Sequence, residues 1–148
     1  MLPTTTERVM LSSGDAPNRA IAADIRDSVR WHLDHPEEIP SRLRELDAEW
    51  DVERTLEANA STLAFAGVIL GATVDRRWLA LPTIVTAFLF QHAVQGWCPP
   101  LPILRRMGFR SSREIETERS ALKALRGDFS HIQNSQNRGA SALEAAQS

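Results

Sequence analysis

The residues of this chain that could carry chemistry are few, and most of them lie close together. Gln91, His92, Gln95 and Cys98 fall within eight consecutive positions. The three uncharged polar residues could form a proton or ligand site within a helix pair. They could equally supply the hydrogen bonds that hold two helices together, and we favour this role because it is the usual one for such side chains.

Cys98 stands in the sequence Gly-Trp-Cys-Pro and is the only cysteine. A single thiol excludes an internal disulfide and a multi-cysteine zinc site. Cys98 could be a redox thiol, an acylation site or a haem ligand, but we favour a small apolar residue at a helix end. His32 and His35 have a spacing that could hold a metal, yet Pro36 ends their helix. We therefore expect no catalytic residue, no metal and no cofactor.

Gln91, His92, Gln95 and Cys98 all lie in a long apolar stretch, Ala58–Leu104. Its only charged residues are Asp75, Arg76 and Arg77, which are adjacent. They separate charge-free runs of 17 and 27 residues. About 20 helical residues cross a bilayer core of about 30 Å. The pattern predicts an all-α fold with a two-helix transmembrane hairpin, with spans at 55–74 and 78–98. The alternative is a soluble bundle that buries the hairpin, because the first run is short and two arginines would have to cross.

The remaining chain predicts helices on both sides of the hairpin. A helix capped by Asp15 precedes a second helix that either runs directly into the first span or bends near Asp51. After the hairpin, Ser111 and Glu114 form a capping box, and Gly127 marks a helix end. The predicted segments are a flexible N-terminus (1–14), a helical cytoplasmic arm (15–54), the hairpin (55–98), a juxtamembrane segment with a C-terminal helix (99–129) and a disordered tail (130–148).

The two arms carry opposite charge. Residues 37–57 contain eight acidic residues and three arginines, whereas residues 105–126 contain seven basic residues and three glutamates. The arms could pack their apolar stripes together or remain two independently solvated helices, because exposed ion pairs contribute little. Arg105, Arg106 and Arg110 are expected to contact anionic lipid headgroups, at about 1 kcal/mol each.

Basic residues also predict the orientation. Seven arginines lie in the segments before the first span and after the second, whereas the turn between the spans has two. Because basic residues are enriched on the cytoplasmic side of a membrane, this excess predicts that both termini are cytoplasmic. The N-terminus lacks the basic-then-apolar order of a signal peptide. A net charge of −2, with no basic and aromatic patch, argues against nucleic acid as a partner.

Small residues mark one face of the first span, at Ala60, Ala64, Gly67 and Gly71. The two glycines form a GxxxG motif, which lets two helix backbones approach closely. This face packs either within the hairpin or across a homodimer.

The segment GWCPPLPILRRMGF, which follows the second span, resembles the YgaP-like transmembrane domain family of bacterial inner-membrane proteins. The resemblance covers about Glu53 to Phe109 and rests on Gly96, Trp97, Cys98 and Pro99. It implies a multi-pass, two-helix hairpin in the bacterial inner membrane. Some relatives fuse this hairpin to a rhodanese sulfurtransferase domain, but this chain has neither room for that domain nor a second cysteine.

The sequence therefore predicts a non-enzymatic bacterial inner-membrane protein. Its expected role is that of a homodimerising anchor or an accessory subunit of a membrane assembly. Its expected partners are membrane lipid and either further copies of itself or a larger membrane protein complex. The alternative is a redox, haem or sulfur-handling membrane protein that uses Cys98.

Overall fold

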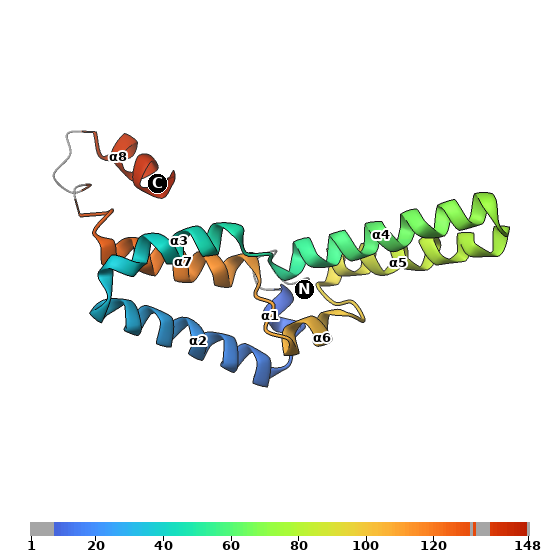
Figure 1. Ribbon diagram of the computed structural model, residues 1–148, viewed down its shortest axis with the longest axis horizontal. Coiled ribbons are helices and arrows are strands. Elements are labelled where there is room, and N and C mark those ends of the chain that lie inside the picture. Colours follow the sequence, from blue (N-terminus) through green and yellow to red (C-terminus); the bar gives the residue numbers. More distant parts are fainter. Residues whose placement is uncertain (1–7, 131, 133–136, 148) are drawn as a thin grey trace. The chain divides into compact units, whose positions relative to one another are not determined.

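The fold is helical throughout the part of the chain that the computed structural model describes, residues 8–130, 132 and 137–147 (Figure 1). The absence of strands among these residues confirms the all-α prediction. In chain order the helices are α1 (Arg8–Leu11), α2 (Asp15–Asp34), η1 (Pro36–Glu38), α3 (Ile39–Ala48), α4 (Val52–Thr73), η2 (Arg76–Leu79), α5 (Ala80–Gln95), α6 (Leu101–Arg106), α7 (Ser112–Arg126) and α8 (Arg138–Gln147).

The chain divides into two compact units. Unit 1 comprises Met1–Ala22 and Trp50–Arg113, and unit 2 comprises Ala23–Glu49 and Glu114–Ser148. Unit 1 contains the long pair α4 and α5, which lie side by side, with η2 at their turn (Figure 1). Its core lies at the other end of the pair and contains Val9, Val52, Leu56, Cys98 and Leu101.

Unit 2 is held together by the arms on either side of the hairpin. Ile39, Leu43 and Leu46 of α3 form one apolar cluster with Ile115 and Leu122 of α7. The two arms therefore pack together rather than remain independently solvated. Apolar burial, at roughly 25 cal/mol per Å², contributes more to this pairing than the exposed ion pairs do.

The helix is interrupted between α3 and α4, near Asp51, where the sequence allowed either a continuous helix or a break. Glu49 and Asp51 have extended backbone, and the Asp51 carboxylate accepts a hydrogen bond of 2.7 Å from the backbone N–H of Arg54. This N-cap satisfies one of the orphan donors of the first turn and starts α4 at Val52. The Arg54 guanidinium lies 4.5 Å from the ring centre of Trp50.

One helical stretch in the described residues, Pro36–Thr73, is long and apolar enough to cross a membrane. Its apolar part is α4, which spans 22 residues. The predicted second span is shorter than expected: α5 has 16 residues and ends at Gln95, not at residue 98. Gly96 ends it with a φ of 80°, a left-handed conformation that glycine adopts without steric cost, and its N–H bonds to His92 O at 2.8 Å.

Two short helices, α1 and α8, lie in the segments predicted to be a flexible N-terminus and a disordered tail. Val9 of α1 is buried in the core of unit 1, and Ala145 of α8 is buried in unit 2. The Lys123 ammonium donates a hydrogen bond of 3.2 Å to the carbonyl of Ala146, which ties α8 to α7. The rest of these two predictions falls partly on residues 1–7, 131, 133–136 and 148, which lie outside the described residues.

Candidate functional site

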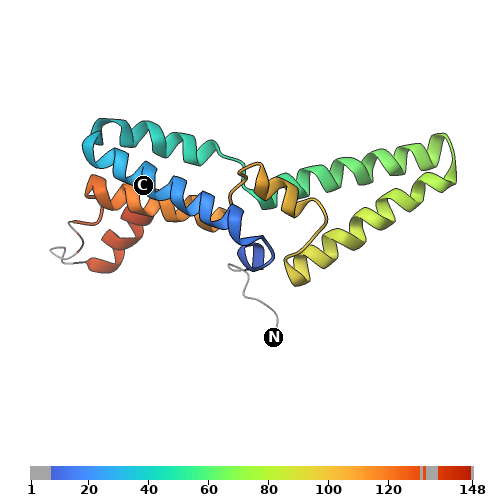
Figure 2. The same cartoon turned by 90° about the horizontal axis from the view of Figure 1, so that it is seen from below.

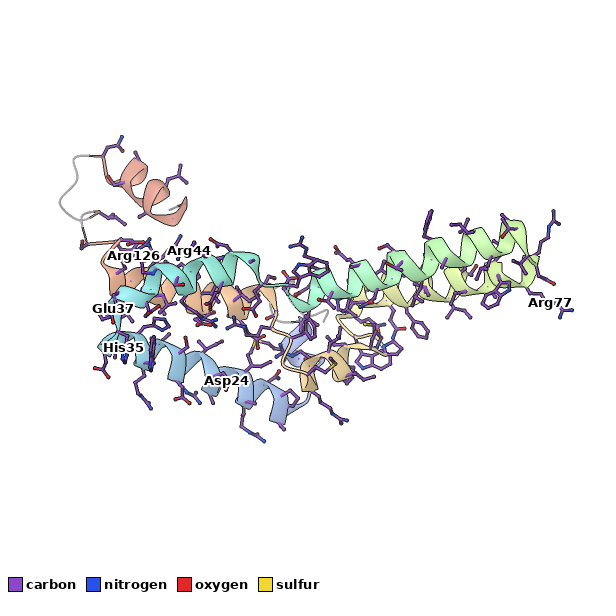
Figure 3. The ribbon with its side chains drawn as sticks, in the orientation of Figure 1. Asp24, His35, Glu37, Arg44, Arg77 and Arg126 are labelled. Atoms are coloured by element: carbon purple, nitrogen blue, oxygen red, sulfur yellow. The ribbon has the colours of Figure 1, made fainter. Side chains whose placement is uncertain are left out.

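Two glycines bring α4 and α5 into close contact at their turn end. A Cβ atom built on Gly67 would lie 2.5 Å from Cδ of Pro82, and one built on Gly71 would lie 2.6 Å from Cδ2 of Leu79. The face of the GxxxG motif is therefore used within unit 1, against α5 and η2. The turn itself is fixed by Asp75, whose carboxylate accepts a hydrogen bond of 2.8 Å from the N–H of Arg77 at the tip of the pair (Figure 3).

At the other end the two helices diverge, as Figure 2 shows. A partly open cavity of about 390 Å³ lies between them, within the size range of small-molecule sites. Its lining is almost wholly apolar. Leu56, Asn59, Ala60 and Leu63 of α4 form one wall, Val85, Phe88, Leu89 and His92 of α5 form the other, and Cys98, Pro99, Pro100 and Leu104 close the base.

The predicted polar cluster is only partly brought together at this cavity. His92 is buried and lines it, whereas Gln91 is half-buried and Gln95 is exposed. On the facing helix, the Asn59 amide donates a hydrogen bond of 2.9 Å to the carbonyl of Thr55 in its own helix. The cavity therefore has one imidazole, one amide and one thiol in a lining that is otherwise hydrocarbon.

Cys98 lies after the end of α5, at the base of the cavity, and is 4% exposed. Burial raises the pKa of the Cys98 thiol, and the backbone N–H of Leu101 offsets part of this shift. A raised pKa leaves less thiolate, and the thiolate is the reactive nucleophile and ligand form. This environment is typical of a packing residue and does not favour the redox alternative.

We therefore expect the Cys98 thiol to react with a soluble maleimide far more slowly in the folded protein than in the unfolded chain. The reason is twofold, because the thiol is covered and its raised pKa reduces the thiolate fraction at neutral pH. Labelling at several pH values in mild detergent and in denaturing detergent measures both effects. A folded protein that labels as fast as the unfolded chain would contradict this assignment.

The three arginines predicted to contact lipid headgroups have different environments. Arg105 is 1% exposed, and its guanidinium donates to the carbonyl of Phe109 at 3.0 Å and to the Asn18 side chain at 2.8 Å. Arg110 is also buried, whereas Arg106 is exposed. Only Arg106 of the three is therefore placed to reach a headgroup, and Arg105 instead links α6 to α2 within unit 1.

The two histidines of α2 bond to their own helix. Nδ1 of His32 lies 2.7 Å from the carbonyl of Ser28, and Nδ1 of His35 lies 2.9 Å from that of Trp31. The His35 ring also stacks on Trp31, with ring centres 4.0 Å apart. Among the described residues, no group of three or more His, Cys, Asp or Glu side chains could hold a metal ion.

Unit 2 contains a buried charge that sequence reasoning missed. The Glu118 carboxylate, fully buried, accepts hydrogen bonds of 2.9 Å and 3.3 Å from Arg42 and one of 2.6 Å from the Ser28 hydroxyl. The signal available was the position of Glu118 on α7: it falls three residues after Ile115 and four before Leu122, on the apolar stripe.

Comparison with protein-family models, with curated proteins and with solved structures finds no match for this chain.

Proposed function

We propose that the protein is a non-enzymatic anchor or accessory subunit of the bacterial inner membrane, in which α4 and α5 form a transmembrane hairpin. One observation carries this proposal: of an 18-residue apolar window within the Pro36–Thr73 stretch, only 22% is buried inside the protein. A core helix of a water-soluble protein would bury most of such a window. Here Phe65 of α4 is 70% exposed and Phe90 of α5 is 72% exposed.

The exposed apolar surface continues around both helices. α5 has no polar face, and exposed large apolar side chains occur on both helices, at Leu63, Phe65, Val68, Ile69, Ile84, Phe88, Phe90 and Val94. Monomeric soluble proteins rarely expose an apolar patch of more than a few hundred Å². A lipid environment accounts for this surface without a further partner.

The lengths are compatible with two crossings. The 22 residues of α4 extend about 33 Å, and residues 78–95 extend about 27 Å, against a hydrocarbon core of about 30 Å. Trp78 and Trp97 are 45% and 40% exposed, and indole rings favour the two membrane interfaces. The excess of arginines in the flanking segments supports cytoplasmic termini, with Arg76 and Arg77 on the far side.

Unit 2 is the part that the hairpin would hold at the membrane. It is a helical assembly with its own core, which suits docking to a membrane complex better than catalysis. Self-association would have to use a surface other than Gly67 and Gly71, because both glycines face α5 or η2 in the same chain. The likeness of residues 96–99 to the YgaP-like motif agrees with an inner-membrane anchor.

Alkaline carbonate extraction of bacterial membranes tests the proposal. We expect the wild-type protein to stay in the membrane pellet. Phe65→Arg, near the centre of the α4 charge-free run, should lower insertion, since an arginine there costs roughly 2.5–3.5 kcal/mol. Thr73→Arg, at the charged end of α4, is the matched control and should have little effect because the side chain reaches the interface.

Recovery of the wild-type protein in the carbonate wash would refute the membrane assignment. Equal behaviour of the two arginine variants would refute it as well, because both side chains are exposed and the two positions differ in their depth in a bilayer.

A further inference from the structure

We infer that the cavity between α4 and α5 binds the ester-proximal half of one acyl chain of a membrane phospholipid, with the ester group of that chain beside His92. The inference rests on the proposed membrane location and adds a specific ligand to it. It concerns unit 1 alone, because every residue that lines the cavity belongs to that unit.

The shape of the cavity follows from the contrast between the two ends of the helix pair. Gly67 and Gly71 hold the helices together near the turn, so the helices can diverge only toward the base. The α4 wall runs from Leu56 to Leu63 and the α5 wall from Val85 to His92, each about 10 Å long. The cavity is therefore a slot that lies along the helices and is closed at its narrow end.

The lining selects a hydrocarbon ligand. Apart from Asn59 and His92, its walls consist of leucine, valine, alanine and phenylalanine side chains, and Cys98 and two prolines contribute to the base. Away from Asn59 and His92, water would find too few polar partners, since a buried water needs two to four. An unfilled space of this size would also lose the dispersion contacts that its lining atoms could make. An apolar chain meets both conditions.

The surroundings of the slot supply such a chain. The cavity is partly open, and exposed apolar side chains such as Leu63 and Phe88 belong both to its wall and to the surface of the pair. If that surface lies in hydrocarbon, the slot is continuous with the lipid phase. An acyl chain can then enter from the side without being removed from the bilayer.

His92 determines the orientation of the acyl chain in the slot, with the ester end at the base. It is three residues before the end of α5, about 4.5 Å along the axis, and is 6% exposed. This depth is close to the interface, where phospholipid ester carbonyls lie, and an imidazole N–H can donate to a carbonyl. The tail would then extend past Leu89 and Phe88 toward the closed end near Val85 and Leu63.

Photolabelling tests the inference. The full chain is reconstituted in vesicles of phosphatidylethanolamine and phosphatidylglycerol that contain a trace of phosphatidylglycerol with a diazirine on one acyl chain. We expect a diazirine near the ester to label the Leu56 and His92 end of the slot, and one near the middle of the chain, about 10 Å from the ester, to label the Leu63 and Val85 end. Peptide mapping by mass spectrometry identifies the labelled residues.

Side chains that fill the slot should abolish the photolabels at its two ends. Ala60→Trp places an indole in the cavity, and Val85→Phe narrows it from the opposite wall, so both should lose the labels inside the slot. Ala66→Trp is the matched control, because Ala66 lies on the same helix but does not line the cavity and is exposed. It should keep those labels, and all variants should keep the labels on outward residues such as Phe65 and Phe90.

Three results would overturn the inference: no label inside the slot, labels that Ala60→Trp and Val85→Phe leave unchanged, or a slot residue that cross-links to a second copy of the chain instead of lipid. Carbonate extraction separates these failures from that of the proposed function. A protein that stays in the membrane pellet but takes up no slot label removes the ligand assignment alone.

Discussion

Replacing Glu118 by alanine is expected to lower the free energy of unfolding of unit 2 by roughly 3 kcal/mol, at the lower end of the range for a broken buried ion pair. The carboxylate has no exposed surface and holds Arg42 by two hydrogen bonds. Its removal leaves the Arg42 guanidinium and the Ser28 hydroxyl without this acceptor in a partly buried site. The cost stays at the lower end because the Arg42 side chain is itself 28% exposed.

Glu45→Ala is the matched control, because Glu45 pairs with the same guanidinium. Its carboxylate lies 2.9 Å from Arg42, as that of Glu118 does, but its side chain is 62% exposed. An exposed pair of this kind contributes less than about 1 kcal/mol. Hydrogen exchange of α3 and α7 in the full-length protein in mild detergent measures both variants. Equal protection in the two would contradict the assignment of Glu118 as the buried anchor of unit 2.

Replacing Gly67 by valine is expected to destabilise the α4–α5 pair by about 1–3 kcal/mol, the usual cost of overpacking a tight contact. The Cβ atom alone would lie 2.5 Å from Cδ of Pro82 and 3.3 Å from its backbone nitrogen. A proline ring and a helix backbone cannot move aside cheaply. Gly71→Val meets mainly the flexible end of Leu79, so its effect should be smaller.

Thermal unfolding in mild detergent, with light scattering to determine the oligomer mass, tests this prediction. Ala66→Val is the control, since Ala66 is next in the chain and exposed. We expect Gly67→Val to lower the unfolding temperature with no change of mass. A lower mass at unchanged stability would instead show that the GxxxG face mediates association between chains.

Local signals predicted the boundaries of α7. This helix begins at Ser112, directly after the expected N-cap Ser111, and ends before Gly127, whose φ is 89°. The charge-free runs also identified α4 and α5 as the most apolar helices. These features depend on neighbouring residues, which is why the sequence alone reveals them.

Features that depend on residues far apart in the chain were not predictable. The buried state of Arg105 depends on Asn18, 87 positions earlier, so a cluster of arginines after a span looked like a headgroup site. The opposite net charges of the arms left their pairing open as one of two alternatives, and in the structure Arg42 of the acidic arm binds Glu118 of the basic one. Net charge therefore did not determine these contacts.

The cavity between α4 and α5 could not be predicted from the sequence either. Its volume depends on the angle at which α4 and α5 diverge, and that angle follows from the Gly67–Pro82 contact about one turn beyond Leu63 and Val85. The short helices α1 and α8 were missed because they have only 4 and 10 residues, too few for a clear helical period. Short helices of this kind form because of tertiary packing, not because of their own propensity.

The discontinuity of unit 2 has a consequence for how the protein is made. Its first segment ends at Glu49 and its second begins at Glu114, so the whole α4–α5 region is synthesised before α7 can meet α3. The entropic cost of closing the loop between α3 and α7 grows only slowly with loop length. The intervening segment therefore delays the pairing of α3 with α7 but adds little to its free-energy cost. Until the ribosome has passed Leu122, the apolar stripe of α3 lacks its partner. Synthesis of the apolar helices α4 and α5 therefore precedes closure of unit 2, and nascent chains that stop early would expose Ile39, Leu43 and Leu46 to chaperones and proteases.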